Sequence, residues 1–198
     1  MRECCDRVEN GGTPKRNVAE YWEPREIPSL TSGEVRQKVV IDTENRISRK
    51  GLENSSAKLW PQETTIVALY GATAGQVTLA AKSLSANQAC CALIAKPNWR
   101  YFVYLHTSSS VQVLEQQTRG SAQQNLSQQI VADLPTVICS DPVCKAFDGR
   151  VAPLFQKWVS NLCESQTLTA VRDTLLPKLI SGELRIKDAE RIAVEPGL

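Results

Sequence analysis

Several motifs that catalysis commonly requires are missing from this sequence. Histidine occurs once, as His106, and none of the seven cysteines belongs to a Cys-x-x-Cys pair. A zinc site needs thiolates and imidazoles at short paired spacings, so we expect no metal site. The sequence has no Gly-x-x-x-x-Gly-Lys-Ser/Thr loop, no Gly-x-Ser-x-Gly turn and no Asn-Pro-Pro-aromatic motif of amino-methyltransferases. We therefore expect no catalytic residue and no cofactor.

Long apolar runs are missing as well. Met1 is followed at once by charged residues, and no apolar run approaches the roughly 20 residues of a membrane span. These absences predict a cytoplasmic protein that has no membrane partner and whose cysteines are reduced. The net charge of +2 is too small by itself to indicate a nucleic-acid partner.

The charge is unevenly distributed along the chain. Residues 36–58 hold six basic and three acidic residues, and residues 64–132 hold four basic residues against Glu115 alone. Residues 141–198 balance at eight of each sign. A basic surface is therefore expected on the first two-thirds of the chain.

The first 140 residues combine short β-rich segments with irregular and polar stretches. Glycine and proline interrupt residues 1–30, which we expect to be irregular. Residues 99–106 fit either a short helix or a strand. The polar stretch 107–129 reads as a linker, or as a segment held to the core by Val111, Val113, Leu114 and Leu126. Short β-rich segments predict strands at Val39–Ile41, Thr65–Tyr70, Gln76–Ala80 and Cys90–Ile94.

From Asp141 onward, apolar residues recur at intervals of three and four, which predicts an amphipathic helix of roughly 30–40 residues. Asp141 and Pro142 suit its first turn, Pro177 predicts a bend or an end near Leu176, and Gly182 predicts a stop. Such a helix is about 45–60 Å long. Part of its apolar stripe therefore needs a partner, unless the stripe folds back on the core of the same chain. The expected divisions are a domain over 1–140, the helix over 141–184 and a tail over 185–198.

An ordered set of short motifs carries a family resemblance. The closing pattern, Arg172-Asp-Thr-Leu-Leu-Pro-Lys-Leu-Ile-Ser-Gly-Glu-Leu184, is long and specific. The earlier motifs are Asn10-Gly-Gly-Thr-Pro14, Glu20-Tyr-Trp22, Glu26-Ile-Pro28, Arg46-Ile-Ser-Arg-Lys-Gly-Leu52, Asn54-Ser-Ser-Ala-Lys58, Tyr70-Gly-Ala-Thr-Ala-Gly75, Asn87-Gln-Ala89 and Gly120-Ser-Ala-Gln-Gln-Asn-Leu126.

This set resembles one half of the specificity subunit of type I restriction-modification enzymes, and the closing pattern is typical of the C-terminal half. The resemblance implies an α+β fold, in which a target-recognition domain with a twisted, mostly antiparallel sheet is followed by a long helix of coiled-coil type. It also implies a non-catalytic role in which double-stranded DNA, a methyltransferase subunit and, through the complex, a motor-nuclease subunit are partners. The sequence contains one such unit, so we expect a homodimer or a second half-subunit to pair with the helix.

A DNA-reading domain needs cations for phosphates and side chains with paired donors or acceptors for base edges. The group around Gly120 mixes a flexible glycine with amides, and we expect it to read bases. The candidate DNA-binding residues are Lys15, Arg16, Arg46, Arg49, Lys50, Lys58, Arg119, Gln123, Gln124 and Asn125. The candidate partner-binding residues are Leu154, Trp158, Leu162, Leu168, Val171, Leu175, Leu176 and Leu179.

Two other functions stay open at this point. The chain is alternatively a helical structural adaptor without DNA specificity, in which each lysine and arginine is an ordinary solvated residue. A free-standing methyltransferase with an unusual motif is the third possibility.

Overall fold

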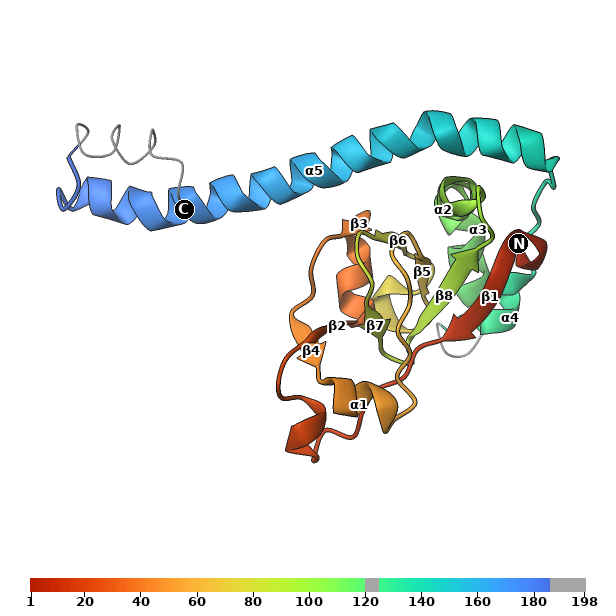
Figure 1. Ribbon diagram of the computed structural model, residues 1–198. Helices are drawn as coiled ribbons and strands as arrows, with labels where there is room; N and C mark the ends of the chain where they lie inside the picture. Colours follow the sequence, from red (N-terminus) through yellow and green to blue (C-terminus); the bar gives the residue numbers. More distant parts are fainter. Residues whose placement is uncertain (120–124, 186–198) are drawn as a thin grey trace. The chain divides into compact units, whose positions relative to one another are not determined.

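The computed structural model describes residues 1–119 and 125–185 (Figure 1). The chain divides into two compact units, residues 1–156 and 157–198, and the division falls inside the long helix α5 (Asp141–Ile180). The expected tail lies outside the described residues apart from Arg185.

The first unit contains a five-stranded sheet in which all neighbouring strands are antiparallel except β3 and β6. The order across the sheet is β1 (Cys5–Asn10), β8 (Cys90–Ala95), β5 (Thr65–Ala68), β6 (Val77–Ala80) and β3 (Val39–Val40). Every residue of β5 and β6 is buried, which explains why these segments are apolar without alternation. The four strands expected from β-rich segments are all present.

A second, three-stranded sheet has the order β4 (Asn45–Ile47), β2 (Ile27–Leu30) and β7 (Ser85–Ala86). Strand β2 is antiparallel to β4 and parallel to β7. The prediction of an α+β fold with mostly antiparallel pairing is confirmed, although the strands form two sheets. The expectation that residues 1–30 are irregular is wrong. Strand β1 escaped notice because it is an edge strand whose exposed face carries polar side chains.

The helices settle both segments that the sequence left open. Residues 99–106 fall largely in a helix, and the described residues of the stretch 107–129 are mostly helical. Leu114 and Leu126 are buried, as expected of anchors, whereas Val113 is 49% exposed. The helices before α5 are α1 (Arg49–Glu53), α2 (Arg100–Ser109), α3 (Val111–Arg119) and α4 (Gln128–Ala132), and the 3-10 turns are η1 (Arg2–Cys4), η2 (Ala19–Tyr21), η3 (Ser32–Arg36) and η4 (Gly71–Thr73).

Helix α5 has the predicted length and ends two residues before Gly182, where a stop was expected. Its 40 residues continue through Pro177 to Ile180, so of the bend or end expected near Leu176, the end does not occur. Pro177 lies in the last exposed turn, where water can satisfy the carbonyl that its missing N–H leaves free. The Ser181 N–H still donates to the Pro177 carbonyl at 2.9 Å, and Gly182 follows with a φ of 75° that suits a helix stop. Within the described part of the chain, no helix is both long and apolar enough to cross a membrane.

Two cysteines differ from the expectation that all are reduced. Cys139 and Cys144 form a disulfide at the start of α5. Cys90 and Cys91 are buried in β8, in line with their apolar context.

Candidate nucleic-acid interface

Several loops meet at one end of the five-stranded sheet. Strand β1 ends beside the start of β8, where Asn10 pairs with Cys91, and β5 ends there too, where Ala68 pairs with Cys90. The Thr13 hydroxyl donates to the side chain of Gln88 at 2.7 Å, which joins two of these loops. We name this region the loop edge, defined as residues 11–22, 49–58, 69–76, 87–89 and 125.

Two glycines let the backbones of the loop edge interlock. A Cβ atom on Gly12 would lie 2.3 Å from the carbonyl oxygen of Ser56, and one on Gly51 would lie 2.3 Å from the carbonyl oxygen of Tyr21. Both distances are far inside van der Waals contact, so only glycine fits. These glycines belong to two of the motifs that carried the family resemblance, and their role here is close packing of α1 against the preceding loop.

Arg46 is turned toward its own domain. Its guanidinium donates to the backbone carbonyls of Arg25 and Glu26 at 3.1 and 3.0 Å and pairs with Asp42 at 3.0 Å. Arg46 therefore ties β4 to the chain before β2, and few of its donors remain for a ligand.

Three other candidate cations form exposed ion pairs. Lys50 lies 2.5 Å from Glu20, and this hydrogen bond raises the pKa of Lys50. The other pairs are Arg49 with Glu26 at 3.6 Å and Lys58 with Glu9 at 3.3 Å. Exposed pairs of this kind contribute at most about 1 kcal/mol, so a phosphate can replace the carboxylate at small cost.

Lys15 and Arg16 differ from these residues. Both are exposed, and within the part of the chain that the structure describes neither has a carboxylate within ion-pair distance. The Cζ atom of Arg16 lies 5.2 Å from the centre of the Trp22 ring. The Trp22 indole N–H donates to the Lys15 carbonyl at 3.1 Å.

The structure tests the expected base-reading group only in part. Gln123 and Gln124 lie outside the described residues, and Arg119 ends α3. Asn125 forms an antiparallel bridge with Tyr70, which places it at the loop edge. Tyr70 is 40% exposed there and was not among the candidates. Its place at the head of the Tyr-Gly-Ala-Thr-Ala-Gly motif was the signal that could have found it.

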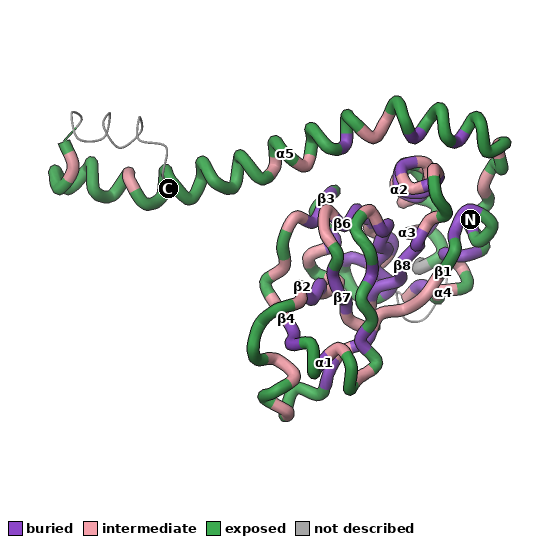
Figure 2. The backbone as a smooth tube through the Cα atoms, in the orientation of Figure 1, coloured by how far each residue is buried: buried purple, intermediate pink, exposed green. Residues whose placement is uncertain are grey.

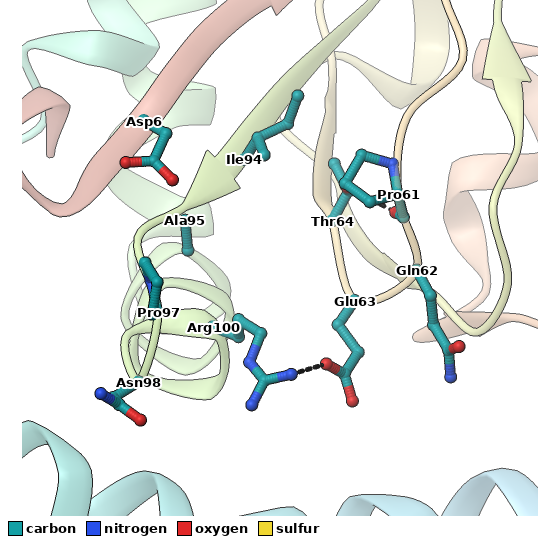
Figure 3. Close-up of a pocket in the computed structure, with 10 residues that line it drawn as sticks. All are labelled: Asp6, Pro61, Gln62, Glu63, Thr64, Ile94, Ala95, Pro97, Asn98 and Arg100. Carbon is teal, nitrogen blue, oxygen red and sulfur yellow. Dashed lines mark hydrogen bonds and ion pairs between the residues drawn. The ribbon is translucent and has the colours of Figure 1, made fainter.

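The opposite end of the sheet carries a pocket of about 430 Å³, where β1 and β5 begin and β8 ends (Figure 3). Arg100 and Glu63 face each other across it and form an ion pair. Asp6 adds another carboxylate to the lining. Acidic groups therefore predominate, which disfavours a nucleic-acid phosphate there. Among the described residues, no group of three histidine, cysteine or carboxylate side chains could hold a metal ion.

The first half of α5 packs onto the domain beside this pocket. Phe155 stacks on Tyr101, with ring centres 4.6 Å apart, and meets Tyr104 edge-on at 5.4 Å. The buried carboxylate of Asp148 accepts from Arg100 at 3.0 Å, and the Tyr101 hydroxyl donates to Glu63 at 2.6 Å. Burial and the bond to Glu63 raise the pKa of Tyr101. This part of the stripe thus folds back on its own chain, which was the alternative considered above.

Most of the remaining stripe residues are exposed to solvent (Figure 2). Leu162 and Leu175 are half-buried. The exposed members are Leu154, Trp158, Leu168, Val171, Leu176 and Leu179, at 69, 36, 61, 46, 49 and 37%.

Residues 3–137 match the family model described as the type I restriction modification DNA specificity domain. The chain belongs to this family. The match covers both sheets and the loop edge, and it confirms the resemblance drawn from the motifs.

Two curated members of the family illustrate the extent of the similarity. The type I restriction enzyme HindI specificity subunit of Haemophilus influenzae is 27% identical over 179 residues, which cover 88% of this chain and 39% of that protein. The MjaIX specificity subunit of Methanocaldococcus jannaschii is 25% identical over 187 residues, which cover 92% and 43%. The chain therefore spans about two-fifths of the length of these relatives.

Solved structures of the family agree on the fold. The type I restriction-modification S subunit from M. genitalium superposes with a TM-score of 0.63 at 15% identity, covering 87% of this chain and 42% of that one. The HsdS subunit from Thermoanaerobacter tengcongensis gives a TM-score of 0.53 at 15% identity, covering 92% and 44%.

Proposed function

We propose that this chain is a non-catalytic component of a type I restriction-modification system that recognises a DNA sequence. The loop edge is the observation that carries the proposal. It presents exposed cations, two of them without a carboxylate partner in the described structure, on loops fixed by close backbone packing. The family membership and the relatives named as specificity subunits support the same role.

Salt dependence of duplex binding tests the proposal. Each phosphate contact releases counterions, so the logarithm of the binding constant should fall with the logarithm of salt by about 0.9 for each contact. We expect Lys50→Ala and Lys58→Ala to weaken all duplexes about equally and to reduce this slope. Lys157→Ala, an exposed cation on α5, is the matched control and should change nothing. Flat binding between low and physiological salt would instead favour the structural adaptor.

The base-reading assignment is a separate proposal. We expect Gln123→Ala or Arg119→Ala to relax discrimination at one or two base pairs, by about 1–3 kcal/mol if the lost contact is bidentate. Methylome sequencing of a host that carries each variant would report the modified motif directly. An unchanged motif with unchanged modification efficiency would show that this loop does not read bases.

We further propose that the exposed stripe of α5 binds protein partners. Leu175, Leu176 and Leu179 form an apolar group near Arg172 and Lys178, and we assign it to the methyltransferase subunit, with the motor-nuclease subunit joining through the complex. A chain truncated after Val171 should remain folded yet fail to co-purify with the methyltransferase subunit. Retained co-purification would contradict this assignment.

The same stripe supports pairing with a second copy or a second half-subunit. Exposed apolar surface costs about 25 cal/mol for each Å², and two-fold pairing is the commonest way for identical chains to cover it. A homodimer would recognise two identical half-sites in inverted order. Light scattering at micromolar concentration should therefore give twice the 21.8 kDa of one chain. A monomer would exclude the homodimer, and an asymmetric methylated motif would indicate a different half-subunit as partner.

A further inference from the structure

We propose that Arg16 reads a base pair of the target, and that Trp22 holds its guanidinium in position to do so. The inference rests on the proposed function and assigns to Arg16 a role separate from that of its neighbour Lys15. The observation behind it is the Arg16 guanidinium lying over the Trp22 ring at 5.2 Å.

The charges around Arg16 and Lys15 set these two residues apart from the other candidate cations whose side chains the structure describes. Arg46, Arg49, Lys50 and Lys58 each have a carboxylate within 4 Å, which competes with a new acceptor for their donors. Among the described residues, no carboxylate lies within that distance of Arg16. Its attraction to an incoming acceptor is therefore not reduced by an existing pair.

The ring beneath Arg16 is held firmly in place. The indole N–H of Trp22 donates to the Lys15 carbonyl at 3.1 Å, and the Trp22 backbone N–H donates to the Ala19 carbonyl at 2.9 Å. The preceding residues are anchored as well. The Ser48 hydroxyl donates to the Glu20 carbonyl at 2.6 Å, and the Ser48 N–H donates to the Tyr21 carbonyl at 3.0 Å. A side chain whose support is fixed in this way loses little conformational entropy on binding.

The shape of the guanidinium decides which ligand suits this arrangement. Its five N–H donors lie in one plane, and among the described residues the Arg16 side chain contacts the Trp22 ring but has no hydrogen-bond acceptor. The major-groove edge of guanine offers two adjacent acceptors, O6 and N7, that match two of these donors. A lysine ammonium is a compact point charge better suited to a phosphate, so we assign Lys15 to the backbone and Arg16 to a guanine.

The inference is tested by binding of the full chain to a duplex that carries the motif reported by methylome sequencing of its host, and to duplexes in which each base pair of that motif is changed in turn. Arg16→Ala should weaken binding to the target by about 5- to 150-fold and make one base pair irrelevant. Arg16→Lys keeps the charge and should restore the salt dependence without restoring that discrimination. The control, Lys15→Ala, should weaken every duplex by the same factor.

A second variant protects the test against a folding artefact. Trp22→Leu keeps Arg16 but removes the ring, and it should lower discrimination at the same base pair by about 2- to 5-fold. Equal weakening of all duplexes by Arg16→Ala would make Arg16 a phosphate contact, and unchanged binding would make it an ordinary surface residue. Either result overturns the inference while leaving the proposed function intact. A wild-type chain that binds no duplex would overturn both.

Discussion

The two halves of α5 belong to different compact units, although they form one continuous helix with a similar apolar period. The half before residue 157 buries Asp148 and Phe155 against α2, whereas no described residue from 157 to 185 is buried. One of these two buried side chains is the carboxylate of Asp148, and an apolar pattern does not predict that a carboxylate is buried. Periodicity therefore identifies the helix, but the surroundings decide which residues of its stripe hold the domain together and which are left for a partner.

The largest expected contrast between the two units concerns their cysteines. Burial raises the pKa of Cys90 and Cys91 to about 12, whereas Cys163 is exposed on the second half of α5. Because the thiolate is the reactive form, that shift alone lowers reactivity near neutral pH by about 1000-fold. A thiol-reactive dye should label Cys163 first, as peptide mass mapping over time would show. Equal labelling of Cys90 in the native protein would mean that the sheet opens readily.

Truncating a side chain in the first half of α5 should lower the free energy of unfolding more than truncating one in the second half. Phe155→Ala leaves a cavity beside Tyr101 and should lower the free energy of unfolding by about 3 kcal/mol. Leu168→Ala is the matched control, because Leu168 is 61% exposed on the second half of α5 and should cost under about 0.5 kcal/mol in the monomer. Urea unfolding followed by circular dichroism would measure both. Similar losses would show that the first half is no better packed than the second.

A smaller effect is expected for the carboxylate. Asp148→Ala removes the 3.0 Å hydrogen bond from Arg100 but leaves the ion pair of Arg100 with Glu63. We therefore expect the free energy of unfolding to fall by about 2 kcal/mol. Asp173→Ala provides the comparison, since Asp173 pairs with Arg172 on the exposed half and should change stability by less than about 0.5 kcal/mol. The same urea series applies. An Asp148 variant as stable as the Asp173 variant would mean that Arg100 and Glu63 suffice to hold the helix.

At the loop edge, the sequence motifs predict which residues are candidates but not how each side chain is held. The sequence predicted Lys15 and Arg16 as DNA contacts, and both directly follow the family motif Asn10-Gly-Gly-Thr-Pro14. It gave no reason to separate Arg16 from Arg46, since both are arginines in basic surroundings. The folded structure separates them, because Arg46 donates to the carbonyls of Arg25 and Glu26, whereas the Arg16 guanidinium contacts the Trp22 ring.

Local patterns were sufficient wherever the cause of structure is local. The buried strands and the 40-residue helix follow from β-rich runs and from apolar residues spaced by threes and fours, and the α+β class follows from the family motifs. The edge strand β1, the burial of Asp148 and the ion pairs of the candidate cations depend on residues far away in the chain. Tertiary structure decided these because hydrogen bonds and ion pairs act over a few ångströms, and only folding brings residues such as Arg100 and Asp148 within that distance.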